Sequence, residues 1–92
     1  MVYELLNVGA QNAQSAKELA SVLQVDPRTV SEFVERERRE GKPICATCRG
    51  SNAGYFIPAN RSEMHDYCGA LLHRINEITE TFKACVRAAR NL

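Results

Sequence analysis

Four residues of the sequence have the types and the spacing of a zinc site. Cys45 and Cys48 form a Cys-x-x-Cys pair, and His65 and Cys68 form a His-x-x-Cys pair, with sixteen residues between the two pairs. Thiolate and imidazole groups in two such pairs are the usual ligands of a structural zinc ion. A zinc centre at Cys45, Cys48, His65 and Cys68 is therefore one interpretation of this part of the chain.

The expected secondary structure argues against that zinc centre. Residues three apart in an extended strand point to opposite faces, so Cys45 and Cys48 converge on one ion only if a tight turn replaces the strand. Cys68 also falls on an apolar helical stripe, where a reduced thiol packs as a small hydrophobic group. Redox exchange is disfavoured too, because a reactive Cys-x-x-Cys pair normally begins a helix, whereas a Gly-rich turn follows here. We expect no metal and no cofactor, and the zinc site stays as the alternative.

No group of residues typical of catalysis accompanies the cysteines. His65 and His73 have no nucleophile and no pair of carboxylates placed beside them, and the sequence contains no phosphate-binding loop or dinucleotide fingerprint. The 92 residues suffice for one small domain, and 12 basic against 11 acidic residues give a net charge of +1. Any attraction to nucleic acid must therefore be local. We expect a protein that is not an enzyme and identify no small-molecule substrate.

The apolar pattern bears on the compartment. No apolar run reaches the roughly 20 residues that a bilayer span needs. Met1 is followed by Val-Tyr-Glu rather than by the basic and then apolar pattern of a signal peptide. We expect a cytoplasmic protein with no membrane partner, in which the four cysteines are reduced thiols.

Two capped helices are predicted in the first half of the chain. A serine cap with Glu18 three residues later predicts a short helix over Ser15–Leu23. An aspartate cap followed by proline predicts a second, longer helix over Asp26–Glu40, which ends at Gly41. The residues of the second helix that should face inward are Val30, Phe33 and Val34.

A hairpin should follow the second helix. The β-branched and apolar run Ile44–Cys48 and the aromatic run Tyr55–Ile57 flank a turn cluster, Arg49–Gly54. Helix, turn, helix and then hairpin is the element order of a winged helix, with the hairpin as the wing. The Cys-x-x-Cys stretch is then the first wing strand and its tip.

One ordered set of residues between Ser15 and Pro58, a stretch of 44 of the 92 residues, carries a family resemblance. The set is Ala16, Glu18, Leu19, Ala20, Arg28, Thr29, Val30, Val34, Arg38, Gly41, Pro43, Ile44, Gly54 and Tyr55. It resembles the winged helix-turn-helix domain found at the N-terminus of bifunctional biotin-protein ligase repressors and in small phage-type transcriptional regulators. The chain departs from that family pattern at Glu37, where an apolar residue is usual.

The resemblance implies a sequence-specific double-stranded DNA-binding protein, a small dimeric transcriptional regulator of phage or mobile-element type. In a helix-turn-helix the first half of the second helix meets the groove, where Arg28 can bond guanine and Glu32 can accept from cytosine. The residues predicted to contact DNA are Lys17, Arg28, Thr29, Ser31, Glu32, Arg36, Arg39, Arg49, Ser51 and Asn52.

The charges of this domain leave a second function open. Residues 1–60 contain seven basic and seven acidic side chains, although residues 41–62 contain three basic ones and no acidic one. The arginines from Arg36 to Arg39 can be a solvated helix face paired with the interleaved glutamates. The alternative function is therefore a winged helix used as a protein-protein interaction module in a larger complex.

The last third of the chain predicts a long helix. Asn60 or Ser62 can cap it, and apolar or small residues then recur in alternating steps of four and three, which is a heptad seam. A helix from Arg61 to Asn91 is about 46 Å long, whereas a 60-residue domain is only about 27 Å across. The seam residues predicted to form a dimer are Met64, Cys68, Leu71, Ile75, Ile78, Phe82, Cys85 and Ala89.

Two expectations follow for this segment. The helix should extend beyond its own domain and pair with a second copy as a coiled coil, the other interpretation being a lone helix folded back on its domain. Tyr67, Leu72, Val86 and Ala88 widen the stripe, so the helix should touch a further neighbour, such as a helix around Val2–Val8. The predicted fold is therefore mainly α with a small β-hairpin: a winged helix-turn-helix domain at 1–60 and a C-terminal dimerisation helix at 61–92.

Overall fold

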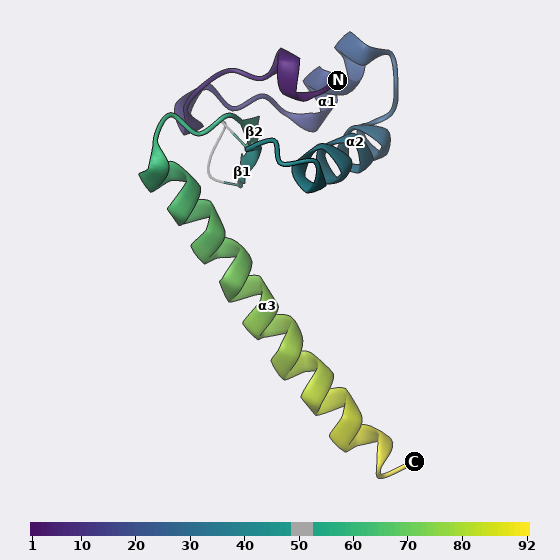
Figure 1. The fold of residues 1–92 in the computed structure, drawn as a ribbon. Helices are drawn as coiled ribbons and strands as arrows, with labels where there is room; N and C mark the ends of the chain where they lie inside the picture. Colours follow the sequence, from purple (N-terminus) through teal and green to yellow (C-terminus); the bar gives the residue numbers. More distant parts are fainter. Residues whose placement is uncertain (49–52) are drawn as a thin grey trace.

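The computed structural model describes residues 1–48 and 53–92. Its described residues form a mainly helical fold with one small hairpin and a long C-terminal helix (Figure 1). The elements are the 3-10 turns Tyr3–Leu5 and Ala10–Asn12, the helices α1 (Ala16–Leu23), α2 (Pro27–Arg39) and α3 (Arg61–Ala89), and the strands β1 (Cys45–Thr47) and β2 (Gly54–Phe56).

Each helix begins at a side-chain cap, as predicted. The Ser15 hydroxyl accepts the N–H of Glu18 at 3.0 Å, and the Asp26 carboxylate accepts the N–H of Thr29 at 2.9 Å. Of the two candidate caps of α3, Asn60 fills the role, because its side-chain oxygen accepts from Glu63 at 3.0 Å. These caps satisfy backbone donors that a helix end leaves unpaired. Helix starts were therefore readable from local sequence.

The core lies between α1, α2 and the N-terminal segment. Val30 and Val34 are buried as predicted, whereas Phe33 is only partly buried. The expected helix around Val2–Val8 is wrong, because that segment contains only a three-residue 3-10 turn. Its apolar side chains belong to the domain core, which comprises Val2, Leu6, Leu19, Ala20, Val30, Val34 and Ile44.

The hairpin is antiparallel and is fastened to the N-terminal segment. Cys45 pairs with Phe56, and on the other edge of β2 the backbone of Tyr55 exchanges two hydrogen bonds with Gln14, at 2.8 and 2.9 Å. Gly54 has a φ of 155°, and a Cβ built on it would overlap the carbonyl group of Gln14. Only glycine therefore allows the two backbones to come this close.

Helix α3 leaves the domain as a single rod, and its C-terminus lies far from the domain (Figure 1). The longest dimension of the molecule is 49 Å, and none of the α3 residues is buried. The observed helix ends at Ala89, two residues before the predicted end. It does not fold back on its own domain. Among the described residues, no helix combines the length and the apolar character needed to cross a membrane.

Candidate nucleic-acid interface

The exposed face of α2 carries half of the side chains predicted to contact DNA. Arg28, Ser31, Glu32, Arg36 and Arg39 are all exposed, because they lie opposite the buried Val30 and Val34. The face is an open, shallow surface rather than an enclosed pocket. An exposed helix with arginines along one side can enter a groove or meet another protein.

Glutamates pair with two of these arginines. Arg28 Nε lies 3.8 Å from Glu32 Oε1, and Arg39 Nη2 lies 3.9 Å from Glu35 Oε2. The arginine side chains are 90% and 83% exposed, and such surface pairs stabilise by only about 0 to 1 kcal/mol. The pairs therefore give the face a mixed charge, but a phosphate or another carboxylate can replace either glutamate at small free-energy loss.

The two hydroxyl side chains on α2 that were predicted to meet DNA have partners within the protein. The Thr29 hydroxyl donates to Asp26 at 2.9 Å, and this bond together with the Thr29 N–H lowers the pKa of Asp26, the N–H having the larger effect. The Ser31 hydroxyl lies 3.2 Å from the hydroxyl of Tyr55. Thr29 thus belongs to the helix cap, and Ser31 joins α2 to β2.

Four other predicted DNA contacts come from α1 or from residues 49–52, and one more comes from α2. Lys17 is exposed on α1. Arg49, Ser51 and Asn52 lie outside the described residues, so their place relative to α2 stays a prediction. Arg36, on α2 itself, packs its guanidinium over the ring of Phe33 at 5.4 Å, which holds the cation at the surface while covering an apolar side chain.

Arg38 has a structural role that its arginine-rich surroundings concealed. Its Nε donates to the carbonyl of Ile44 at 2.9 Å, and its Nη1 lies 3.2 Å from Glu35. The guanidinium also lies 5.9 Å from the ring centre of Tyr55 and 5.0 Å from that of Tyr67. One side chain therefore connects α2, the segment before β1, β2 and α3. Three of these four partners are distant in sequence or lie on another element, so no local pattern announced the role.

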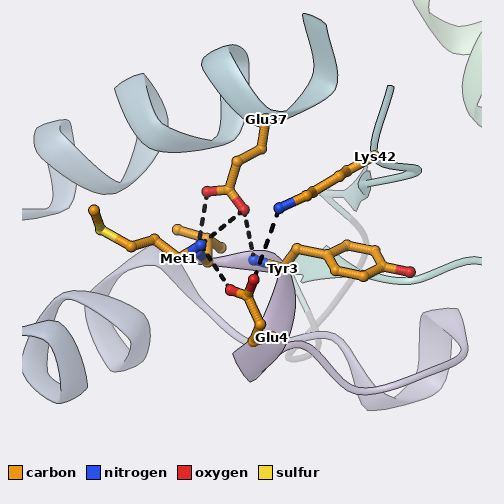
Figure 2. Close-up of polar contacts among 6 residues, drawn as sticks. Met1, Tyr3, Glu4, Glu37 and Lys42 are labelled. Atoms are coloured by element: carbon orange, nitrogen blue, oxygen red, sulfur yellow. Dashed lines mark hydrogen bonds and ion pairs between the residues drawn. The ribbon is translucent and has the colours of Figure 1, made fainter. Parts of the chain in front are cut away.

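Glu37, the departure from the family pattern, is the second residue whose role the sequence did not indicate. It is only 5% exposed, and its carboxylate accepts the backbone N–H of Val2 at 3.0 Å and of Tyr3 at 2.9 Å (Figure 2). The ammonium group of Met1 lies 3.3 Å away. Figure 2 also shows Lys42 and Glu4, whose ion pair measures 3.7 Å, beside this cluster. The charge on α2 is therefore an anchor for the N-terminal segment.

The pKa of Glu37 reflects this anchoring. Burial alone raises the pKa of a carboxyl group, and here burial is the largest single influence. The hydrogen bonds from Tyr3 and Val2 and the nearby ammonium together outweigh it, so the pKa of Glu37 is below its ordinary value. Glu37 is therefore ionised at neutral pH although it is buried.

The four candidate zinc ligands are not assembled into a site. Cys45 is fully buried on β1, with its Sγ 3.9 Å from Met64 Sδ, whereas Cys48, His65 and Cys68 are exposed. Within residues 1–48 and 53–92, no three His, Cys, Asp or Glu side chains are grouped so that they could hold a metal ion. Burial raises the pKa of the Cys45 thiol to about 11, which is the opposite of what a reactive thiol requires.

The seam of α3 divides into two parts. Met64 and Leu71 are half-buried on the side that faces the domain, where Met64 contacts Cys45. Further along, the large apolar side chains are exposed, from 58% for Ile75 to 66% for Phe82. The other exposed seam residues are Cys68, Ile78, Cys85 and Ala89. Met64 thus contacts the domain, Ile75 and Ile78 line an open groove beside α2, and the seam residues from Phe82 onward are exposed.

Comparison of this chain with protein-family models, with curated proteins and with solved structures found no match.

Proposed function

We propose that this chain is a winged helix-turn-helix protein that binds double-stranded DNA as a dimer and acts as a small transcriptional regulator. Helices α1 and α2 are the helix-turn-helix, α2 is the recognition helix, and the β1–β2 hairpin is the wing. Helix α3 supplies the dimer contact. The first half of α2 contacts the base edges and so recognises the DNA sequence. The wing and the later arginines of α2 contact phosphate.

The observation that carries this proposal is the contact between Ser31 and Tyr55. It fixes the hairpin beside the exposed face of α2, because Tyr55 is on β2 and is held from the other side by Gln14. A helix and a hairpin placed side by side can engage a groove and the adjacent backbone together. The buried core then serves to hold Arg28 and Arg39 outward on the same surface.

The balanced charge of α2 does not prevent this function. DNA affinity gains separately from each phosphate that is neutralised, so a few well-placed arginines suffice. The pairs Arg28–Glu32 and Arg39–Glu35 are long and exposed, and they exchange partners at small loss. Glu32, once released from Arg28, can accept a hydrogen bond from cytosine N4.

The test is a salt titration of binding to selected and scrambled duplexes, after selection of a preferred site from random duplexes. Arg28→Ala should weaken binding to the preferred site by about 1 to 3 kcal/mol and relax preference at one base pair. Arg39→Ala should weaken all duplexes about equally and reduce the log-salt slope by about one unit. Arg49→Ala, at the predicted wing tip, should behave like Arg39→Ala.

The matched control is Arg87→Ala, which removes an exposed arginine from α3, remote from the proposed interface. It should change neither affinity nor salt slope. If the wild-type protein shows no salt-dependent binding to any duplex, the DNA-binding proposal is wrong.

The mixed charge of α2 supports a second candidate function, a winged helix that binds another protein. An exposed helix with interleaved arginine and glutamate favours a partner surface that carries both charges over a uniformly negative one. In that case Arg28→Ala and Glu32→Ala should weaken partner binding to similar extents. In the DNA case, loss of Glu32 should affect sequence preference far more than overall affinity.

A further inference from the structure

The second half of α3 exposes an apolar stripe that a single chain cannot cover. Leu72, Ile75, Ile78, Phe82 and Val86 are between 42% and 66% exposed, although they lie on one broad side of the helix. A helix that buries no side chain over this length is marginal in water. Contiguous apolar surface of this kind marks an interaction site.

Residues 67–78 of α3 form one wall of a groove. The groove has a volume of about 290 Å³ and lies between α3 and α2, with Tyr67, Leu71, Ile75 and Ile78 on one wall and Glu35 and Arg38 on the other. Its α3 wall is mostly apolar, although Arg74 also lines it, and it continues directly into the exposed stripe. The groove and the stripe are therefore one surface, bounded at one end by the domain and open at the other.

The seam of α3 is self-complementary when a second copy runs in the opposite direction. From Met64 to Ala89 the steps are 4, 3, 4, 3, 4, 3 and 4, which read the same from either end. Reversing one copy about the midpoint between Asn76 and Glu77 therefore keeps every seam position in register. The facing positions are Met64 with Ala89, Cys68 with Cys85, Leu71 with Phe82, and Ile75 with Ile78.

The shape of the molecule favours this direction over the parallel one. Each chain has a domain at one end of α3 and a bare helix at the other (Figure 1). In a parallel pair the two domains compete for space at the same end, which leaves residues 72–89, about 27 Å of helix, to form the contact. In an antiparallel pair the two domains lie at opposite ends, and each groove faces the bare end of the second helix.

We propose that two copies of this chain pair their α3 helices antiparallel, with Phe82 of each copy seated opposite Leu71 at the groove of the other. The inference rests on the dimer of the proposed function and adds its direction and register. It places Cys68 beside Cys85 of the second copy. In a parallel pair in register, these two cysteines lie about 25 Å apart along the axis, and each faces its own counterpart.

The test is thiol cross-linking with a short bifunctional reagent, read by the mass of the dimer and by sequencing of the linked peptides. All chains carry Cys48→Ser, which removes an exposed thiol outside α3, and the buried Cys45 is left in place. The expected link joins Cys68 to Cys85. Cys68→Ser alone and Cys85→Ser alone should each lose the covalent dimer, and mixing the two variants should restore it.

A parallel pair gives the opposite pattern, in which each single variant still cross-links through its remaining cysteine. That result, a dimer without any Cys68–Cys85 link, or a chain that stays monomeric at high micromolar concentration would each overturn the inference. The first two results leave the dimer and the DNA titration untouched, so failure of the direction is distinguishable from failure of the function.

A second measurement tests the position of Phe82 at the groove of the second copy. Phe82→Ala should raise the dissociation constant of the dimer about 10-fold or more, because a large apolar side chain leaves the groove. Arg87→Ala, on the polar side of the same helix, should change it less than about 3-fold. Equal effects of the two variants would contradict the assigned register.

Discussion

The N-terminal domain and the free half of α3 both have apolar residues at helical spacing, yet only the domain buries them. Val30 and Val34 of α2 are 0% and 1% exposed, whereas Phe82 of α3 is 66% exposed. The difference is that α2 has neighbours on three sides, namely α1, the N-terminal segment and the hairpin. Periodicity therefore tells which face of a helix will be covered, but not which molecule covers it.

The largest effect on stability is expected at Gly54, where the domain has no room for a side chain. Gly54→Ala places a methyl group on the Gln14 carbonyl, so β2 and the N-terminal segment must separate. We expect a loss of about 4 kcal/mol or more in the free energy of unfolding, enough to unfold much of a marginally stable domain. Urea denaturation followed by circular dichroism measures it.

The matched control for that change is in α3. Gly69→Ala adds the same methyl group in a helix where nothing lies within 4 Å of it. It should stabilise α3 by about 0.5 to 1 kcal/mol, because alanine favours helix over glycine. A Gly54→Ala protein as stable as the wild type would show that the Gln14–Tyr55 pairing is dispensable.

The next effect is expected at the buried carboxylate. Glu37→Ala leaves the N–H groups of Val2 and Tyr3 without their acceptor, so the free energy of unfolding should fall by about 2 to 4 kcal/mol. Glu37→Gln keeps an acceptor and should lose less. Glu40→Ala, an exposed glutamate just after the same helix, is the control and should lie within about 0.5 kcal/mol of the wild type.

Glu37 also predicts a pH dependence. Its pKa is lower in the folded state than in the unfolded chain, so its stabilisation is complete above the ordinary value of about 4.3. The stabilisation is lost as the pH falls below that value and through the lowered pKa of the folded state. The midpoint temperature of thermal unfolding should therefore fall more steeply in acid for the wild type than for Glu37→Gln. Parallel pH profiles would contradict this assignment.

A smaller effect should separate the two cysteines of the Cys-x-x-Cys pair. Cys45→Ser puts a hydroxyl in the core and should lower the free energy of unfolding by about 1 to 3 kcal/mol, whereas the exposed Cys48→Ser should change it by less than about 0.5 kcal/mol. Denaturation with and without a chelator measures both. A chelator that destabilises the wild type, with equal losses in both variants, would instead support a shared metal ion.

The smallest effect on the domain should come from the largest deletion. A chain that ends at Leu71 loses only side chains that are not buried. The free energy of unfolding of its domain should therefore lie within about 0.5 kcal/mol of that of the full-length monomer. The comparison must be made at a concentration where both are monomeric by sedimentation. A domain that fails to fold after this truncation would place α3 within its cooperative unit, and the contrast between the two regions would disappear.

The sequence predicted the features that are encoded locally. Ser15, Asp26 and Asn60 announce helix starts because each cap and its partner lie three residues apart. The bond between Glu37 and Tyr3 spans 34 positions, and the Gln14–Tyr55 pairing spans 41, so neither leaves a periodic signal. An isolated glutamate among the apolar positions of α2 is the only trace of the Glu37 contact in the sequence, and its type alone does not indicate a role.

The candidate interface was predictable to a similar degree. The exposed arginines of α2 follow from the opposite, buried stripe, because a helix has two faces. Thr29 has a second role that its position does not indicate, since the same aspartate that caps the helix also accepts from its side chain. The Arg38 side chain packs against Tyr55 and Tyr67. These two rings come together only in the folded chain, so the sequence does not indicate this contact.

The contacts of Arg38 have a mechanical consequence. One guanidinium contacts rings on both β2 and α3 and donates to the backbone before β1. It therefore acts as the joint between the N-terminal domain and the long helix α3. A tilt of about 5° at this joint moves the far end of a rod about 43 Å long by about 4 Å. Small tilts of α2 on a bound partner therefore produce displacements of about three-quarters of a helical turn at the other end of the molecule.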